Sequence, residues 1–96
     1  MKLTSAQIKS TTSQFAAEAV PEGNPILPEL RDLFGEHTFL VGGNGLHIVE
    51  PAEPNQPGST IGRVVKLASW TNPEHTTLAT HPPAQTNIVI DLDKAA

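Results

Sequence analysis

The sequence contains no cysteine and no tyrosine, and its aromatic residues are one tryptophan and three phenylalanines. The absence of cysteine excludes a disulfide framework and any thiolate metal site. Six Lys and Arg residues stand against ten Asp and Glu residues, so the net charge is −4. Because no basic cluster is present to neutralise phosphates, we expect no binding to nucleic acid.

Long apolar runs are also missing. No segment approaches the ~20 apolar residues that a membrane-spanning helix requires. Met1-Lys2-Leu3 leads directly into Thr4 and Ser5, so the opening lacks the apolar core of a signal peptide. We therefore expect a cytoplasmic protein with no membrane partner. At 96 residues, the chain has room for a single domain, residues 1–96, with a modest core.

The strongest structural signal is a β-hairpin around Gly42-Gly43-Asn44-Gly45, with a short apolar run on each side. A type I′ turn at Asn44-Gly45 pairs Val41 with Ile48, whereas a four-residue loop pairs Val41 with Leu46. The two registers differ by an even step, so both leave the same side chains on the core face. These side chains are Phe39, Val41, Leu46 and Ile48.

Two helices are predicted before this hairpin. A capping-box pattern at Thr4 and Gln7 opens a helix over about 4–20. A second helix covers about 25–35, and its apolar residues recur at helical spacing. We expect this second helix to anchor the core through Leu30, Leu33 and Phe34.

Alternating apolar residues predict five strands, over about 37–41, 46–50, 62–71, 76–81 and 87–92. Pro82-Pro83 is expected to end the fourth strand. The proline-rich segment 50–59 is predicted to be an exposed loop, which is either functional or a plain linker. Together these elements predict an α+β domain, with two N-terminal helices packed on one face of a mostly antiparallel sheet of about five strands.

The strand region has a pattern of its own. Gly45-Leu46-His47-Ile48-Val49-Glu50, followed by Gly62-Arg63-Val64-Val65-Lys66-Leu67-Ala68-Ser69-Trp70, resembles small uncharacterised bacterial proteins of unknown function. The resemblance covers only the strands and includes no catalytic motif. It implies a small bacterial cytosolic protein and transfers no activity, cofactor or functional residue.

Catalytic motifs are absent from the sequence. There is no Gly-x-Ser-x-Gly elbow, and the glycine run lacks the Lys and Ser/Thr of a phosphate loop. The four histidines are the obvious source of metal ligands, but none has the i, i+4 spacing of a metalloprotease. We therefore predict no cofactor and no metal. The alternative is a pocket for a metal or a small ligand, formed near His47, His75 and His81.

Apolar residues on both faces of the first three strands indicate a partner surface, because two helices suffice for only one face. A monomer seldom exposes a large apolar patch, and tryptophan is enriched at interface centres. The leading hypothesis is a non-enzymatic interaction module that forms a homodimer or binds an unidentified protein. Its predicted interface residues are Leu40, Val49, Val64 and Trp70. The rival hypothesis is a small-ligand or metal-binding protein, with catalysis left open.

Overall fold

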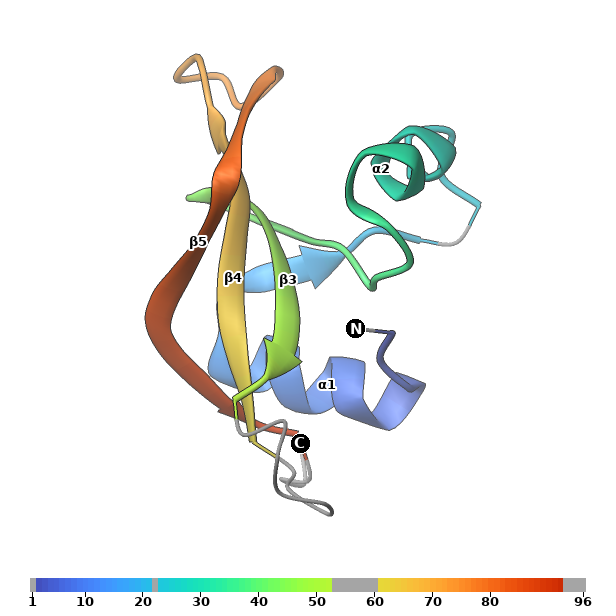
Figure 1. Cartoon of the computed structure of the whole chain (residues 1–96), viewed down its shortest axis with the longest axis vertical. Coiled ribbons are helices and arrows are strands. Elements are labelled where there is room, and N and C mark those ends of the chain that lie inside the picture. Colours follow the sequence, from blue (N-terminus) through green and yellow to red (C-terminus); the bar gives the residue numbers. More distant parts are fainter. Residues whose placement is uncertain (1, 22, 53–60, 93–96) are drawn as a thin grey trace.

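The computed structural model describes residues 2–21, 23–52 and 61–92. A five-stranded antiparallel sheet dominates them, and its spatial order is β1-β2-β3-β4-β5 (Figure 1). The strands are β1 (Ala17–Ala19), β2 (Leu40–Gly42), β3 (Gly45–Pro51), β4 (Ile61–Trp70) and β5 (Leu78–Asp91). The helices are α1 (Ser5–Gln14), which precedes the sheet, and α2 (Leu27–Phe34), which lies in the connection between β1 and β2.

The predicted arrangement of two N-terminal helices on one face of the sheet is wrong. Strands hold 45% of the described residues and helices hold 22%, so the sheet dominates and the α+β class fits only loosely. Helix α1 ends at Gln14, and Phe15 already has an extended backbone. Ala17–Ala19 then pair with β2. Alanine favours helices, and here pairing with a neighbouring strand overrides that local preference.

The start of α1 follows the predicted capping box. The Thr4 hydroxyl accepts a hydrogen bond from the Gln7 backbone N–H, and the Gln7 side chain accepts one from the Thr4 N–H. The residues that α1 itself buries, Ser10 and Thr11, are polar. Its apolar contribution therefore comes from Leu3 just before it and Phe15 just after it.

Two apolar clusters fill the two faces of the sheet. The first cluster contains Leu27, Leu30, Phe39, Leu46, Ile48, Val65, Leu67 and Ala68, with Val41 packed against it. The predicted core face of the hairpin is therefore confirmed. The second cluster contains Phe15, Leu40, Val49, Val64, Ile90 and Leu92, with Leu3 and Ile88 packed against it. Helix α2 serves the first cluster, and the residues flanking α1 serve the second, so each face has its own cover.

The hairpin turn has the register predicted for a four-residue loop, with Val41 opposite Leu46, and its strands extend until Gly42 pairs with Gly45. A type I′ turn at Asn44-Gly45 is not formed, because Asn44 has no positive φ. Gly45 does, at 121°, and a Cβ added there would lie 2.1 Å from the carbonyl oxygen of Ala68. Glycine is thus required at this position by backbone conformation and by close approach of β4.

The predicted fourth and fifth strands form one strand, β5, which passes through Pro82-Pro83. It has fourteen residues against ten in β4, and its pairing with β4 shifts register twice. One shift contains the two prolines. They are tolerated there because the residues within the shift are not paired in the ladder, and because β5 is an edge strand. At the other shift, the Thr86 hydroxyl donates to the Val64 carbonyl at 2.7 Å and accepts from the Ile88 N–H at 3.1 Å.

Helix α2 is shorter than predicted and presents only part of its apolar face to the core. It begins at Leu27 and buries Leu27 and Leu30. Leu33, which we expected in the core, is 66% exposed. The proline-rich loop lies mostly outside the described residues, as does the end of the chain after Leu92. Within the described ranges, no helix is long and apolar enough to cross a membrane.

Replacing Gly45 with Ala is expected to lower the free energy of unfolding by at least about 2 kcal/mol, because the new Cβ meets β4 backbone in a strained conformation. The matched control is Gly43→Ala, where nothing lies within 4 Å of the new Cβ. Urea unfolding of both variants measures the difference. Equal stabilities would contradict the close approach of Gly45 to Ala68.

Helix α2 offers a second matched pair. Leu30→Ala should cost about 2–5 kcal/mol, as expected for a buried leucine, whereas Leu33→Ala should cost less than about 1 kcal/mol. Both values come from the same urea melts. A loss for Leu33→Ala as large as that for Leu30→Ala would mean that α2 packs with a different face.

Candidate functional site

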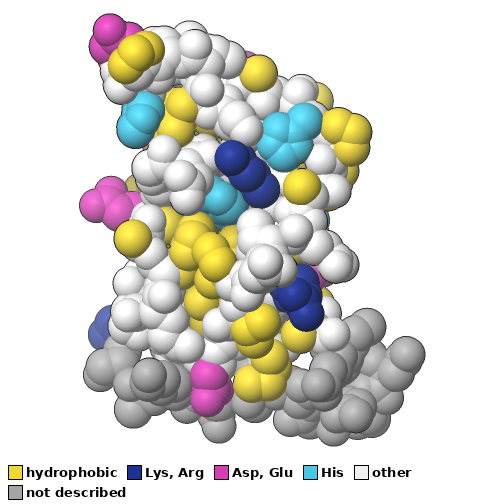
Figure 2. Space-filling model, turned by 90° about the vertical axis from the view of Figure 1, so that its left-hand side faces the viewer, with side chains coloured by type: hydrophobic (Ala, Val, Ile, Leu, Met, Phe, Trp, Pro, Cys, Tyr) yellow, Lys and Arg dark blue, Asp and Glu magenta, His cyan; other side chains and the backbone are white. Residues whose placement is uncertain are grey.

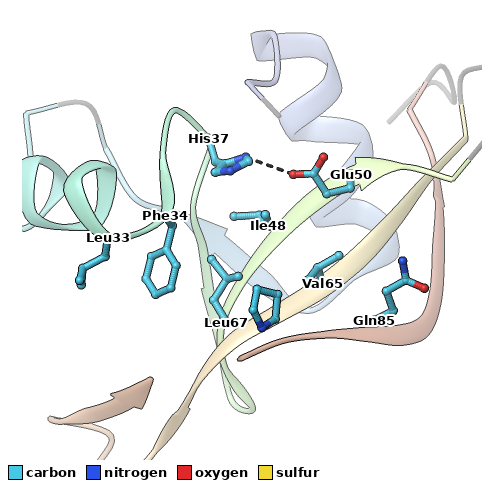
Figure 3. Close-up of a pocket in the computed structure, with 9 residues that line it drawn as sticks. Leu33, Phe34, His37, Ile48, Glu50, Val65, Leu67 and Gln85 are labelled. Carbon is cyan, nitrogen blue, oxygen red and sulfur yellow. Dashed lines mark ion pairs between the residues drawn. The ribbon is translucent and has the colours of Figure 1, made fainter. Parts of the chain in front are cut away.

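A groove of about 560 Å³ lies between the C-terminal end of α2 and the sheet face that carries the first cluster (Figure 3). Its floor and walls are apolar over most of their extent, and polar groups lie at the rim. The lining residues are Leu33, Phe34, His37, Ile48, Glu50, Val65, Leu67, Pro83 and Gln85.

Strand periodicity builds the floor. Alternate residues of a strand point to the same face, and three neighbouring strands each contribute such a pair to the groove. The pairs are Ile48 with Glu50, Val65 with Leu67, and Pro83 with Gln85. In the ladder Ile48 lies opposite Val65, which lies opposite Gln85, so one row of side chains crosses the groove from β3 to β5.

The short helix bounds the groove on one side, and the apolar side chains of the floor are themselves buried. Helix α2 has eight residues and places Leu27 and Leu30 over the first cluster. Its last residues, Leu33 and Phe34, form one wall of the groove, and Figure 3 shows Gln85 on the far side of the floor. Leu33 is largely exposed while floor residue Leu67 is 1% exposed. A ligand bound in the groove would cover the exposed side chain of Leu33.

The polar rim is centred on a contact between a histidine and a glutamate. The Nδ1 atom of His37 lies 3.3 Å from Oε1 of Glu50, and the His37 ring packs edge-on against Phe39 at a centroid distance of 6.0 Å. Arg63 is the ladder partner of Glu50, and its guanidinium donates to the Thr86 carbonyl at 3.1 Å. The two ionisable side chains that line the groove are therefore paired with one another.

The groove carries one histidine–glutamate pair among mostly apolar side chains. Its described lining includes no Ser, Thr, Cys, Lys or Tyr side chain. His37 has a carboxylate beside it, as a general base often does. The groove can hold an apolar molecule and orient it through hydrogen bonds.

The residues predicted to form an interface are largely internal. Leu40, Val49 and Val64 are fully buried in the second cluster of the same chain, where the flanks of α1 and the end of β5 cover them. Trp70 is half-buried. Its indole N–H donates to the Gly42 carbonyl at 2.8 Å, and its ring stacks on His75 at a centroid distance of 4.9 Å. Only Trp70 of the four retains surface for a partner.

The three histidines of the alternative hypothesis occupy different surroundings. His47 is buried, His75 stacks on Trp70, and the ring Nδ1 of His81 is 2.9 Å from the Pro82 carbonyl oxygen. Within the described part of the chain, no three His, Asp or Glu side chains are grouped in a way that could hold a metal ion. None of the three histidines lines the groove, whereas His37 does.

Sequence reasoning missed His37 and the groove. The alternation of Val65 and Leu67, and of Ile48 and Glu50, was visible as a signal that each pair shares a face. The sequence does not predict where α2 lies over the sheet, because that position depends on packing. It predicts a strand end at Pro82-Pro83, and therefore does not predict that Pro83 lines the groove.

His47 lies on the opposite face of the sheet from the groove. His47 is 2% exposed, contacts the Phe15 ring edge-on at 5.0 Å, and has no hydrogen-bond partner at Nδ1 among the described residues. The outer side of the molecule, on which β5 lies in Figure 1, has hydrophobic side chains in its middle, with several histidines and Lys or Arg side chains on the same side (Figure 2). Burial lowers the pKa of His47, its ladder partner Lys66 lowers it further, and a hydrogen bond with the Gly45 backbone opposes both.

Comparison with known proteins adds no relative. No protein-family model matches the chain, and neither a curated protein nor a solved structure is significantly similar to it. The resemblance to small bacterial proteins therefore stays a prediction. Inferences about function rest on the groove and its chemistry.

His47 should make stability depend on pH. Because its pKa in the folded protein lies below the ordinary 6.5, the unfolded chain takes up this proton at a higher pH than the folded chain. The free energy of unfolding should therefore fall as the pH drops through 6.5, and level off only below the folded-state pKa. Urea melts at several pH values, compared with His47→Leu, isolate this contribution.

The matched control for that experiment is His81→Gln, which should keep the wild-type fall in stability. A His47→Leu variant that loses stability on acidification as steeply as the wild type would contradict a buried, neutral His47.

Proposed function

We propose that this protein is a non-enzymatic binding protein that holds a small, largely apolar ligand in the groove between α2 and strands β3, β4 and β5. The observation that carries the proposal is a groove with an apolar floor of buried Ile48, Val65 and Leu67, beside a wall in which Leu33 is 66% exposed. Small-molecule sites are typically concave, mostly apolar, and roughly 300–1,000 Å³ in volume. The groove has these properties.

The walls support this reading. Leu33 is 66% exposed in the free protein, and a ligand lying between it and the floor would remove its side chain from water. Burial of apolar surface contributes roughly 25 cal/mol per Å², so covering Leu33 favours binding. The His37–Glu50 pair at the rim offers both a hydrogen-bond donor and an acceptor with which to orient the ligand.

Self-association through the second sheet face is not carried into this proposal. Three of its four predicted interface residues are covered by their own chain, so they provide no surface to a partner. The groove has the reverse property, since its wall includes Leu33, which is 66% exposed. Of the two hypotheses drawn from the sequence, the groove therefore favours the small-ligand hypothesis, although the pocket involves His37 rather than His47, His75 or His81.

Binding of 4-phenylphenol, a rigid two-ring probe, tests the proposal. Titration followed by methyl NMR should shift the signals of Ile48, Val65 and Leu67. Leu33→Ala should weaken binding roughly fivefold, the equivalent of about 1 kcal/mol of apolar contact. The folded state survives this change, because Leu33 contributes little to the core.

The control variant is Val89→Ala, which also shortens an exposed apolar side chain, 47% exposed, but one outside the groove. It should leave the dissociation constant unchanged. Methyl shifts confined to other parts of the molecule, or no binding at millimolar probe, would refute the groove as a ligand site.

A further inference from the structure

We propose that the ligand of the groove is an elongated, uncharged molecule with a ring body and a hydrogen-bonding group at each end. This inference rests on the proposed function and specifies the chemical class that the site recognises. Its basis is the placement of polar side chains at opposite sides of an apolar floor, together with the opposite charges of Glu50 and Arg63 at neighbouring ladder positions.

The two polar positions are separated by the width of three strands. Glu50, with His37 against it, lies on β3, and Gln85 lies on β5. The row Ile48, Val65, Gln85 crosses the floor between them. Neighbouring strands lie about 4.8 Å apart, so two strand spacings place the polar ends roughly 10 Å from one another. Figure 3 shows the same arrangement, with Val65 between Gln85 and the His37–Glu50 pair.

Gln85 is suited to bind one end of such a molecule. It is exposed at the rim, and its side-chain amide makes no hydrogen bond with the described part of the protein. An amide presents one acceptor and two donors, so it can pair with a hydroxyl, a carbonyl or an amide of a ligand. A purely apolar ligand covering it would leave these groups without partners, which costs binding energy.

The charges at the other end favour an uncharged group. The His37 imidazole and the Glu50 carboxylate are paired, and Arg63 beside them on the ladder is held by the Thr86 carbonyl. The Glu50 carboxylate and the Arg63 guanidinium carry opposite charges at neighbouring ladder positions, so neither an anionic nor a cationic ligand group meets a net opposite charge that would offset its lost hydration. A hydroxyl or carbonyl needs only a donor or an acceptor, and the His37–Glu50 pair provides both. The Phe34 ring in the wall suits a ring body.

Three rigid probes with the same two-ring body test the inference: 4-phenylphenol, biphenyl-4,4′-diol and 4′-hydroxybiphenyl-4-carboxylate. The wild-type protein should bind the diol roughly three- to tenfold more tightly than 4-phenylphenol, the gain expected from one additional hydrogen bond. The carboxylate should bind more weakly than the diol. Calorimetric titration gives the constants, and methyl NMR places each probe.

Gln85→Leu should abolish the preference for the diol over 4-phenylphenol. The matched control, Asn87→Leu, alters another exposed amide of β5 that does not line the groove, and should retain the preference. A preference that survives in Gln85→Leu, a diol no tighter than 4-phenylphenol, or a carboxylate tighter than the diol would overturn this inference while leaving the groove as a binding site. Failure of all three probes to bind would overturn the proposed function as well.

Discussion

The fold depends on one constraint: strands β3 and β4 carry large apolar side chains on both faces, and each face must be removed from water. Leu46, Ile48 and Val65 point to one side, and Val49 and Val64 to the other. A single helical layer cannot satisfy both. The chain covers the first face with α2, and the second with the residues that flank α1 and with the C-terminal part of β5. The division of the helices between the faces follows from this requirement.

Irregular pairing lets the sheet meet the constraint in so short a chain. In β4, Leu67 and Ala68 are neighbours yet belong to the same cluster, because the pairing with β3 shifts register beside them. In β5, four extra residues relative to β4 are taken up at two shifts. One shift contains Pro83, which lines the groove, and at the other the Thr86 hydroxyl donates to the Val64 carbonyl. Strand β5 therefore contains Pro82 and Pro83 and still pairs with β4 on both sides of them.

The groove exists because α2 covers only part of the first face of the sheet. Helix α2 buries Leu27 and Leu30 in the first cluster, whereas its last residues, Leu33 and Phe34, form a wall of the groove. What remains is an apolar floor between an exposed leucine and an exposed glutamine, with a paired histidine and glutamate at one side. These surroundings exclude water from most of the floor and leave polar contacts only at the rim, which is the distribution expected of a small-molecule site. On the second face, Leu40, Val49 and Val64 are fully buried.

The sequence by itself determined the local features: the capping box at Thr4 and Gln7, the hairpin and its core side chains, and the inward alternation of Ile88, Ile90 and Leu92. Each depends on residues close together in the chain. Only the tertiary structure decided that Ala17–Ala19 form a strand, that Pro82-Pro83 lie within β5, that the end of α2 forms a wall of the groove, and that His37 meets Glu50. These outcomes depend on contacts between distant segments, and the stabilising effect of such contacts exceeds the weak local preferences from which a strand, a helix or a break is predicted.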